Sequence, residues 1–186
     1  MGFTKEQLAA FEGGVVDDLI GPEVRLLFVG INPGLWTAAT NTHFCHPSNR
    51  FYPALRAAGL MDWAFDTSIG MSREERDRFA RSGIGICNLV DRATARASQL
   101  TASELREGAL RLERTVEGVS PRVVAIAGIT AYRTAFRRAA ALIGRQPETM
   151  AGARVWVVPN PSGLNAHETI ESLAAFYRLV ADEAGL

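Results

Sequence analysis

The sequence predicts an α/β fold, a three-layer α/β/α sandwich around a short, mainly parallel sheet of four strands. Two observations support this prediction. Four short apolar runs are rich in β-branched residues, as strands covered on both faces are, and they occupy residues 24–31, 83–90, 122–129 and 153–158. Helical patterns separate these runs, and strands that alternate with helices are typical of a parallel sheet.

The expected helices begin at polar residues that can cap a helix. Ser72 with Glu75 and Thr101 with Glu104 have the spacing of a capping box. The five expected helices cover residues 50–59, 72–81, 101–118, 130–142 and 168–184. Residues 61–71 are expected to form a loop with short helical pieces, and residues 144–152 a surface turn.

One domain, residues 1–186, is expected, with a peripheral N-terminal segment at about residues 1–20. A chain of 186 residues is long enough to bury a sizeable core, and no repeat or linker divides it. The sequence has neither the basic-then-apolar pattern of a signal peptide nor an apolar stretch that could span a bilayer. We therefore expect a cytoplasmic monomer.

Composition excludes some kinds of site. The formal net charge is zero, which argues against a protein that coats DNA by charge alone but leaves a local basic face open. Cys45 and Cys87 are too few for a disulfide framework or a four-cysteine metal site. His43 and His46 have no acidic residue beside them in the sequence, so we expect no metal and no other cofactor.

The first strand runs into a tight turn with the sequence GINPG, residues 30–34. In an open parallel sheet, ligands bind at the carboxyl ends of the strands, which is where Asn32 of this turn should lie. The alternative is that Asn32 merely caps a helix. The turn has neither the glycine spacing of a dinucleotide-binding loop nor the lysine of a phosphate-binding loop.

Two large apolar residues lie in predicted loops, where exposed polar residues are more usual. Phe44 lies in a polar loop and could stack on a nucleobase, or it could fold back onto the core. Leu164 follows a glycine in the turn NPSGL, residues 160–164. It could insert into a stack of base pairs, or it could pack as a hydrophobic staple on the helix that begins near His167.

Four motifs together resemble one known family. GINPG, HPSNRFY (residues 46–52), LVDR (residues 89–92) and NPSGL follow one another in this order, and the resemblance spans about residues 24–180. In this respect the chain resembles the mismatch-specific branch of the uracil-DNA glycosylase superfamily, the relatives of thymine-DNA glycosylase. The resemblance implies an enzyme that flips uracil, or a related modified pyrimidine, out of mismatched duplex DNA and hydrolyses its N-glycosidic bond.

The resemblance also implies roles for individual residues. Asn32 would position the water that attacks the sugar, and Phe44 would stack on the flipped base while nearby backbone groups read its edge. The remaining base-binding positions would be Ile31, Thr37 and Asn160. The wedge that fills the vacated space and contacts the opposite strand would be Gly163, Leu164 and Asn165. The partner would be double-stranded DNA with uracil or a related lesion, and single-stranded DNA remains an open alternative.

Two residues depart from the family's pattern. Trp36 stands where a small polar residue is expected, and Ala166 stands where a basic residue often follows the wedge. Trp36 could reshape the pocket, and Ala166 could weaken the grip on the DNA backbone.

The chemistry of bond hydrolysis suggests one further catalytic residue, and the lysine content argues against a lyase mechanism. An amide cannot take a proton from water, so a carboxylate at a neighbouring strand end would help, and Asp91 is the best placed. The alternative is that Asp91 forms an ion pair with Arg92 or Arg96, or caps a helix. The only lysine, Lys5, precedes the first strand, so we do not expect a lyase that forms a Schiff base. We expect a monofunctional glycosylase instead.

Two other functions remain open at this point. A small-molecule nucleoside hydrolase would need the same pocket but no wedge. A non-catalytic lesion-binding module would flip the base without cutting the bond.

Overall fold

The computed structural model describes residues 2–186 and contains one central sheet of five strands, in the order β2-β1-β3-β5-β4. The strands are β1 (Leu26–Gly30), β2 (Ile84–Asn88), β3 (Val123–Ala127), β4 (Gly144–Met150) and β5 (Ala153–Val158). All neighbouring pairs are parallel except β4 and β5, which are antiparallel. The α/β class and the mainly parallel sheet are confirmed, whereas the expected number of four strands is wrong.

The additional strand, β4, is the segment that we expected to be a surface turn. The turn is shorter and comes later, at Ala151 and Gly152, whose positive φ angles of 44° and 87° suit a tight hairpin. β4 lies at the edge of the sheet, where only Gln146 and Met150 are buried. An edge strand tolerates Pro147 and polar side chains, so its sequence resembles that of a turn.

The five expected helices are present, and the capping boxes at Ser72 and Thr101 form. The helices are α1 (Lys5–Ala9), α2 (Leu35–Thr40), α3 (Phe51–Ala57), α4 (Arg73–Ala80), α5 (Ala102–Val119), α6 (Ile129–Ala135) and α7 (Ile170–Ala184), with a short 3₁₀ helix at Ala97–Gln99. α6 ends before the expected residue 142, because Arg137 adopts a left-handed backbone with φ of 55°. The short helices α1 and α2 were not expected.

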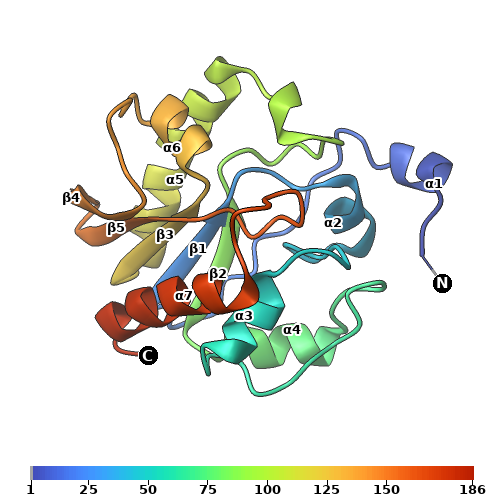
Figure 1. Cartoon of the computed structure of the whole chain (residues 1–186), viewed down its shortest axis with the longest axis horizontal. Helices are drawn as coiled ribbons and strands as arrows, with labels where there is room; N and C mark the ends of the chain where they lie inside the picture. Colours follow the sequence, from blue (N-terminus) through green and yellow to red (C-terminus); the bar gives the residue numbers. More distant parts are fainter. Residues whose placement is uncertain (1) are drawn as a thin grey trace.

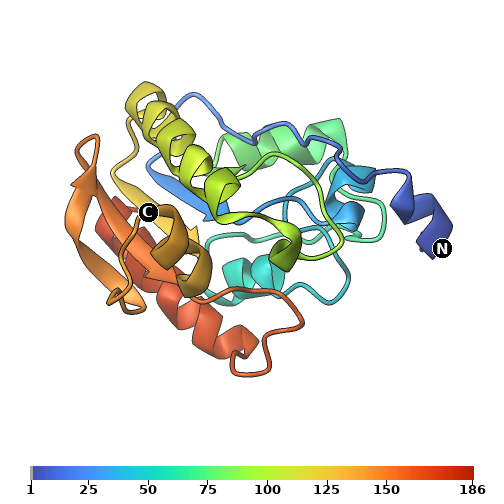
Figure 2. The same ribbon diagram turned by 90° about the horizontal axis from the view of Figure 1, so that it is seen from above.

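Alternate residues of the strands face opposite layers of helices. Leu26 and Phe28 point to the layer that contains α3, α4 and α7, whereas Leu27 and Val29 point to the layer that contains α5 and α6. Figure 1 shows α7 and α3 on one side of the sheet and α5 and α6 on the other. Figure 2 shows the antiparallel pair β4 and β5 at one end of the molecule and the N-terminal helix α1 at the other. These layers make the three-layer sandwich.

The first two strand ends lie side by side. Gly30 of β1 is paired in register with Asn88 of β2, and the backbone pairing continues where Leu89 and Val90 donate to the carbonyls of Gly30 and Ile31, each at 2.9 Å. The turn after β1 and the loop after β2 are therefore fixed together at the carboxyl edge of the sheet. No helix within residues 2–186 combines the length and the apolarity needed to cross a bilayer.

Candidate active site

Asn32 lies at the end of β1 but does not cap α2, whose N-cap is Gly34. Its amide nitrogen instead donates to the Arg92 carbonyl at 2.9 Å, the Thr94 hydroxyl at 2.8 Å and the Pro33 carbonyl at 3.1 Å. The side chain therefore bridges the turn after β1 and the loop after β2. The helix-cap alternative for Asn32 is excluded.

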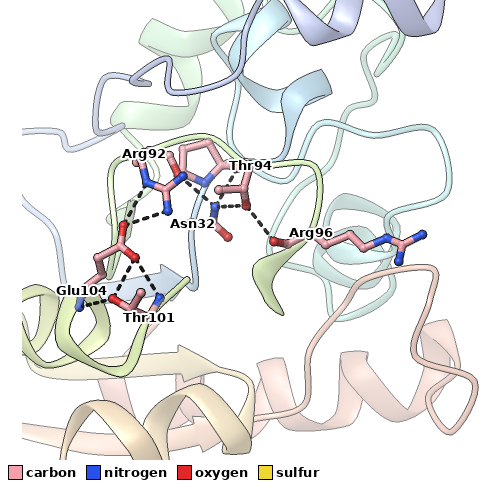
Figure 3. A network of polar contacts seen from close by, with 7 residues as sticks. Asn32, Arg92, Thr94, Arg96, Thr101 and Glu104 are labelled. Carbon is pink, nitrogen blue, oxygen red and sulfur yellow. Dashed lines mark hydrogen bonds and ion pairs between the residues drawn. The ribbon is translucent and has the colours of Figure 1, made fainter. Parts of the chain in front are cut away.

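The orientation of the Asn32 amide follows from its partners. Thr94 is 1 % exposed, and its hydroxyl donates to the Arg96 carbonyl at 2.9 Å. Because the hydroxyl proton is used in that bond, the hydroxyl oxygen can only accept from Asn32. Since all three partners are acceptors, the amide nitrogen must face them. Figure 3 shows the Asn32 oxygen turned away from this network. Asn32 Oδ1 is therefore an oriented acceptor for a water molecule.

The loop that supports Asn32 is itself held by charge. The Arg92 guanidinium donates to Glu104 of α5 at 2.9 Å, and Glu104 also accepts from the backbone N–H of Thr101 at 2.8 Å (Figure 3). These hydrogen bonds hold the pKa of Glu104 below its ordinary value. Arg96 is exposed and extends away from the network, without an ion-pair partner among residues 2–186.

Phe44 lies at the same edge of the sheet, in the loop after α2. Its ring stacks on Phe51 with centroids 4.1 Å apart, and its backbone has a left-handed φ of 54°, which a non-glycine residue adopts only rarely. The ring is only half buried, so Phe51 supports one face while an edge or face remains accessible. Phe44 thus packs on the core, which is one of the two alternatives from the sequence, and it also borders the site, where stacking on a nucleobase stays a prediction.

Asn88 at the end of β2 completes the floor of this site, and our reading of the sequence missed it. A Cβ atom at Gly30 would collide with Asn88 Oδ1 and would lie 3.2 Å from the Phe44 ring. The glycine therefore allows the amide and the ring to meet above the strand end. A polar residue near the end of the apolar run GICNLV is the signal that could have identified Asn88.

Ile31 and Asn160 meet over the end of β3. A Cβ atom at Gly128, which has φ of 106°, would lie 3.2 Å from Ile31 Cδ1 and 3.9 Å from Asn160 Cβ. Asn160 Oδ1 accepts from the backbone N–H of Ser162 at 3.0 Å, which shapes the turn after β5. These two predicted base-binding residues are thus brought together at the edge that carries Asn32.

Thr37 and Trp36 support the site from α2. Thr37 is buried, and its carbonyl accepts from Thr42 N–H at 3.3 Å, which anchors the loop that carries Phe44. The Trp36 indole donates to the Thr67 carbonyl at 3.1 Å and packs edge-on against Phe3, with centroids 5.1 Å apart. The unusual tryptophan therefore joins the N-terminal segment to the loop before α4.

The turn NPSGL projects beyond the sheet edge and is held by Arg50. The Arg50 guanidinium donates to the carbonyls of Ser162 at 3.2 Å and Asn165 at 2.9 Å, and its backbone N–H donates to Pro161 at 3.0 Å. Leu164, at the tip, is 91 % exposed. Since α7 begins at Ile170, well after this leucine, the hydrophobic-staple alternative is excluded.

Gly163 allows the turn to approach the loop before α3. A Cβ atom there would lie 2.7 Å from the Ser48 carbonyl oxygen, which is too close for any other residue without a shift. Asn165 folds back onto the turn, where its amide nitrogen donates to the Asn160 carbonyl at 3.0 Å. The motif HPSNRFY and the motif NPSGL therefore form one surface.

Asp91 has a different partner from the ones expected. Its carboxylate lies 3.1 Å from Arg111 of α5, whereas Arg92 pairs with Glu104. Asp91 also raises the pKa of Asp18, which burial together with this second charge brings to about 6. Among residues 2–186, no hydrogen bond or ion pair connects Asp91 with Asn32. The ion pair favours a structural role, and the catalytic role that the sequence suggested for Asp91 is untested.

The described part of the chain contains no cluster of three or more His, Cys, Asp or Glu side chains that could hold a metal ion. The arrangement at the sheet edge instead consists of amides, a half-buried aromatic ring and backbone groups. It can bind a flat, uncharged ring and orient water.

A mainly parallel sheet whose carboxyl edge carries three amides, a half-buried aromatic ring and an exposed apolar tip is the arrangement of an α/β protein that binds a ligand at its strand ends. The sequence profile of the Uracil DNA glycosylase superfamily matches residues 18–182, and the chain belongs to that superfamily. This membership supports a DNA glycosylase function.

A solved structure agrees with this assignment at the level of the fold. The solution structure of a protein from Methanosarcina acetivorans, provisionally described as a uracil DNA glycosylase, superimposes with a TM-score of 0.60. The two sequences are 17 % identical, and the match covers 90 % of this chain and 98 % of the other.

Proposed function

We propose that this protein is a monofunctional, mismatch-specific DNA glycosylase that flips uracil out of duplex DNA and hydrolyses its N-glycosidic bond. The observation that carries the proposal is the fixed Asn32 amide, whose oxygen is turned away from three acceptors. In this role Asn32 Oδ1 accepts a hydrogen bond from water, so that an oxygen lone pair of the water points to the sugar C1′ of the flipped nucleotide.

We propose roles for the other residues at the carboxyl edge of the sheet from their positions. Phe44, supported by Phe51, stacks on the extruded base, and Ile31 and Asn160 line the adjacent wall. Uracil leaves as an anion that backbone N–H groups can stabilise, so strong acid catalysis is not required. Hydrolysis by water leaves an abasic site and the free base.

The exposed tip favours duplex DNA over a small nucleoside as the substrate. Leu164 is 91 % exposed and is presented by a turn that Arg50 holds, as expected of a side chain that fills the space left by a flipped base. Gly163 and Asn165 keep this turn close to the site. A hydrolase of free nucleosides would gain nothing from such a wedge.

The test is single-turnover cleavage of a duplex with uracil opposite guanine, read as alkali-labile sites. Wild-type protein should release uracil and leave an abasic site at which alkali breaks the strand, and Asn32→Ala should lower the rate of uracil release about a hundredfold or more, the scale of losing a positioned catalytic group. Binding of the uracil duplex should largely persist in this variant. Wild-type protein that binds but never cuts would support the lesion-binding alternative, and cleavage of free deoxyuridine alone would support the nucleoside hydrolase.

A further inference from the structure

His46 and Ser48 form a small turn in the loop before α3. The Ser48 backbone N–H donates to His46 Nδ1 at 3.1 Å, and the Ser48 hydroxyl lies 2.8 Å from the same nitrogen. A backbone N–H can only donate, so Nδ1 must carry a lone pair, and the neutral ring must carry its proton on Nε2. Partial burial of the ring lowers the pKa of His46, which favours this neutral form. The hydroxyl of Ser48 therefore also donates to Nδ1.

Ser48 is the residue on which the turn NPSGL rests. A Cβ atom at Gly163 would lie 2.5 Å from Ser48 Oγ and 2.8 Å from Ser48 Cβ, so the glycine backbone packs directly on this side chain. The hydrogen bond to His46 fixes the Ser48 hydroxyl, and the place of that hydroxyl limits how closely Gly163 can approach. Leu164, which forms the exposed tip, is the next residue along the chain. His46 thus acts on the base of the tip through Ser48.

Trp36 supports His46 from the other side. The two rings pack edge-on, with centroids 5.4 Å apart and planes at 71° to each other. The indole N–H donates to the Thr67 carbonyl at 3.1 Å, so the tryptophan itself has a fixed place. A smaller residue at position 36 would leave this side of the imidazole without support. The residue that departs from the family's pattern is therefore the one that backs the turn formed by His46.

We propose that His46 is a positioning residue for the wedge, which holds Gly163 through Ser48 and so fixes Leu164 at the height from which it enters the base stack. This inference rests on the proposed function, because it assumes that Leu164 enters DNA. Arg50 holds the two ends of the turn, and the contact with Ser48 adds a support between them. A tip that is ordered beforehand loses less conformational freedom when it enters the duplex.

Asparagine can replace the acceptor that His46 provides. An asparagine side chain accepts from the backbone N–H two residues further along, which is the spacing from His46 to Ser48. The same loop already contains such a turn, where Asn49 Oδ1 accepts from Phe51 N–H at 2.9 Å. His46→Asn therefore keeps the acceptor and removes the ring, whereas His46→Leu removes the acceptor. Because His46 is exposed, both variants should fold, and thermal unfolding verifies this.

The first experiment uses the DNA-free protein. Backbone ¹⁵N relaxation measures the order of the Leu164 amide in wild-type protein, His46→Asn and His46→Leu. The order parameter should fall below about 0.6, the range of flexible backbone, in His46→Leu alone. A Leu164 amide that is equally ordered in all three proteins would overturn the proposal. The measurement requires no glycosylase activity.

The second experiment is a double-mutant cycle with Leu164→Ala, read as single-turnover release of uracil opposite guanine. His46→Leu should slow release about tenfold when Leu164 is present but less than about twofold in the Leu164→Ala background, because the tip that His46 positions is then missing. Equal slowing in both backgrounds would contradict the proposal. His46→Asn should stay within about threefold of the wild-type rate. If it is as slow as His46→Leu, the imidazole ring itself contacts DNA and the proposal is wrong.

The two experiments separate this proposal from the proposed function. If the Leu164 amide loses its order in His46→Leu but wild-type protein releases no uracil, the proposed function fails and the support of the turn by His46 stands. If wild-type protein releases uracil but His46→Leu changes neither the order of Leu164 nor the rate, His46 is not a positioning residue and the proposed function stands.

Discussion

The Thr94 hydroxyl lies 2.8 Å from the Asn32 amide nitrogen and can only accept from it, because its own proton is committed to the Arg96 carbonyl. A buried threonine in the loop after β2 thus decides which end of the Asn32 amide faces the site. Thr94 therefore acts on the site through its hydrogen bond to Asn32.

Thr94→Val should impair the orientation of Asn32, and it also removes the hydrogen bond from the hydroxyl to the Arg96 carbonyl within the loop. The valine has no hydroxyl, so one of the three acceptors that fix the amide is lost, and we expect single-turnover cleavage to fall about tenfold while uracil-duplex binding changes little. Thr94→Ser keeps the hydroxyl and should retain most of the rate. If Thr94→Ser is slow while Thr94→Val cuts at the wild-type rate, packing of the methyl group, not the hydroxyl, is what matters.

Phe44→Ala should weaken binding of a uracil duplex by about 1–3 kcal/mol, the usual range for a base that loses its stacking partner. The effect on undamaged duplex should be smaller, because no base is then stacked on the ring. Fluorescence anisotropy with both duplexes measures the difference. Since Phe44 also stacks on Phe51, thermal unfolding must be recorded, and equal losses on the two duplexes would assign Phe44 to folding.

Leu164→Ala should slow cleavage of paired uracil more than cleavage of uracil in a single strand, because only the paired base must be unstacked. Leu142, which is 72 % exposed and lies in the segment between α6 and β4, is the matched control. Leu142→Ala removes the same side chain and should leave the ratio of the two rates unchanged. Equal slowing on both substrates by Leu164→Ala would contradict the wedge.

Asp91→Asn should leave cleavage near the wild-type rate, because the carboxylate is engaged with Arg111. The stability loss should stay within about 1 kcal/mol, as for other exposed ion pairs. A second readout is the pKa of Asp18, which Asp91 raises and which should therefore move down toward its ordinary value. If cleavage collapses while the fold and lesion binding persist, Asp91 belongs to the catalytic machinery, as its place after the second strand predicted.

Asp18, whose pKa burial raises to about 6, stabilises the folded state as the pH falls below 6, whereas the contribution of His43 to the free energy of unfolding should fall as the pH drops from about 6.5 toward 4. Burial lowers the pKa of His43 from its ordinary 6.5 to about 4 in the folded state, so in this window the unfolded chain binds a proton that the folded chain does not. The loss should approach about 3 kcal/mol at the lower end. Urea unfolding of wild-type protein and of His43→Phe at pH 7 and at pH 5 measures it, because Asp18 titrates in both proteins and only wild-type protein should lose the His43 contribution at pH 5.

The sequence contained enough to predict the α/β sandwich, because buried parallel strands are continuous apolar runs and the helices carry their own caps. It was insufficient to predict β4, because this edge strand contains Pro147 and mostly polar residues and therefore resembles an exposed loop in sequence. For the site, Asn32, Phe44 and Leu164 stood out because their residue types are unusual for their loops. Asn88 and Thr94 did not stand out, because their importance depends on contacts with residues that are distant in the sequence.

The placement of Asp91 illustrates the same limit. Its position directly after a strand correctly predicted that it lies near the carboxyl edge, but the direction of its side chain depends on Arg111, twenty residues further along the chain. Partners on a separate helix cannot be read from local sequence.

Arg50 holds the turn NPSGL only through backbone carbonyls and its own N–H. An anchor of this kind is indifferent to the side chain at residue 164, so leucine can be exchanged for a bulkier, smaller or polar group while the turn keeps its place. The tip is consequently a position at which protein engineering can vary the side chain without rebuilding the turn.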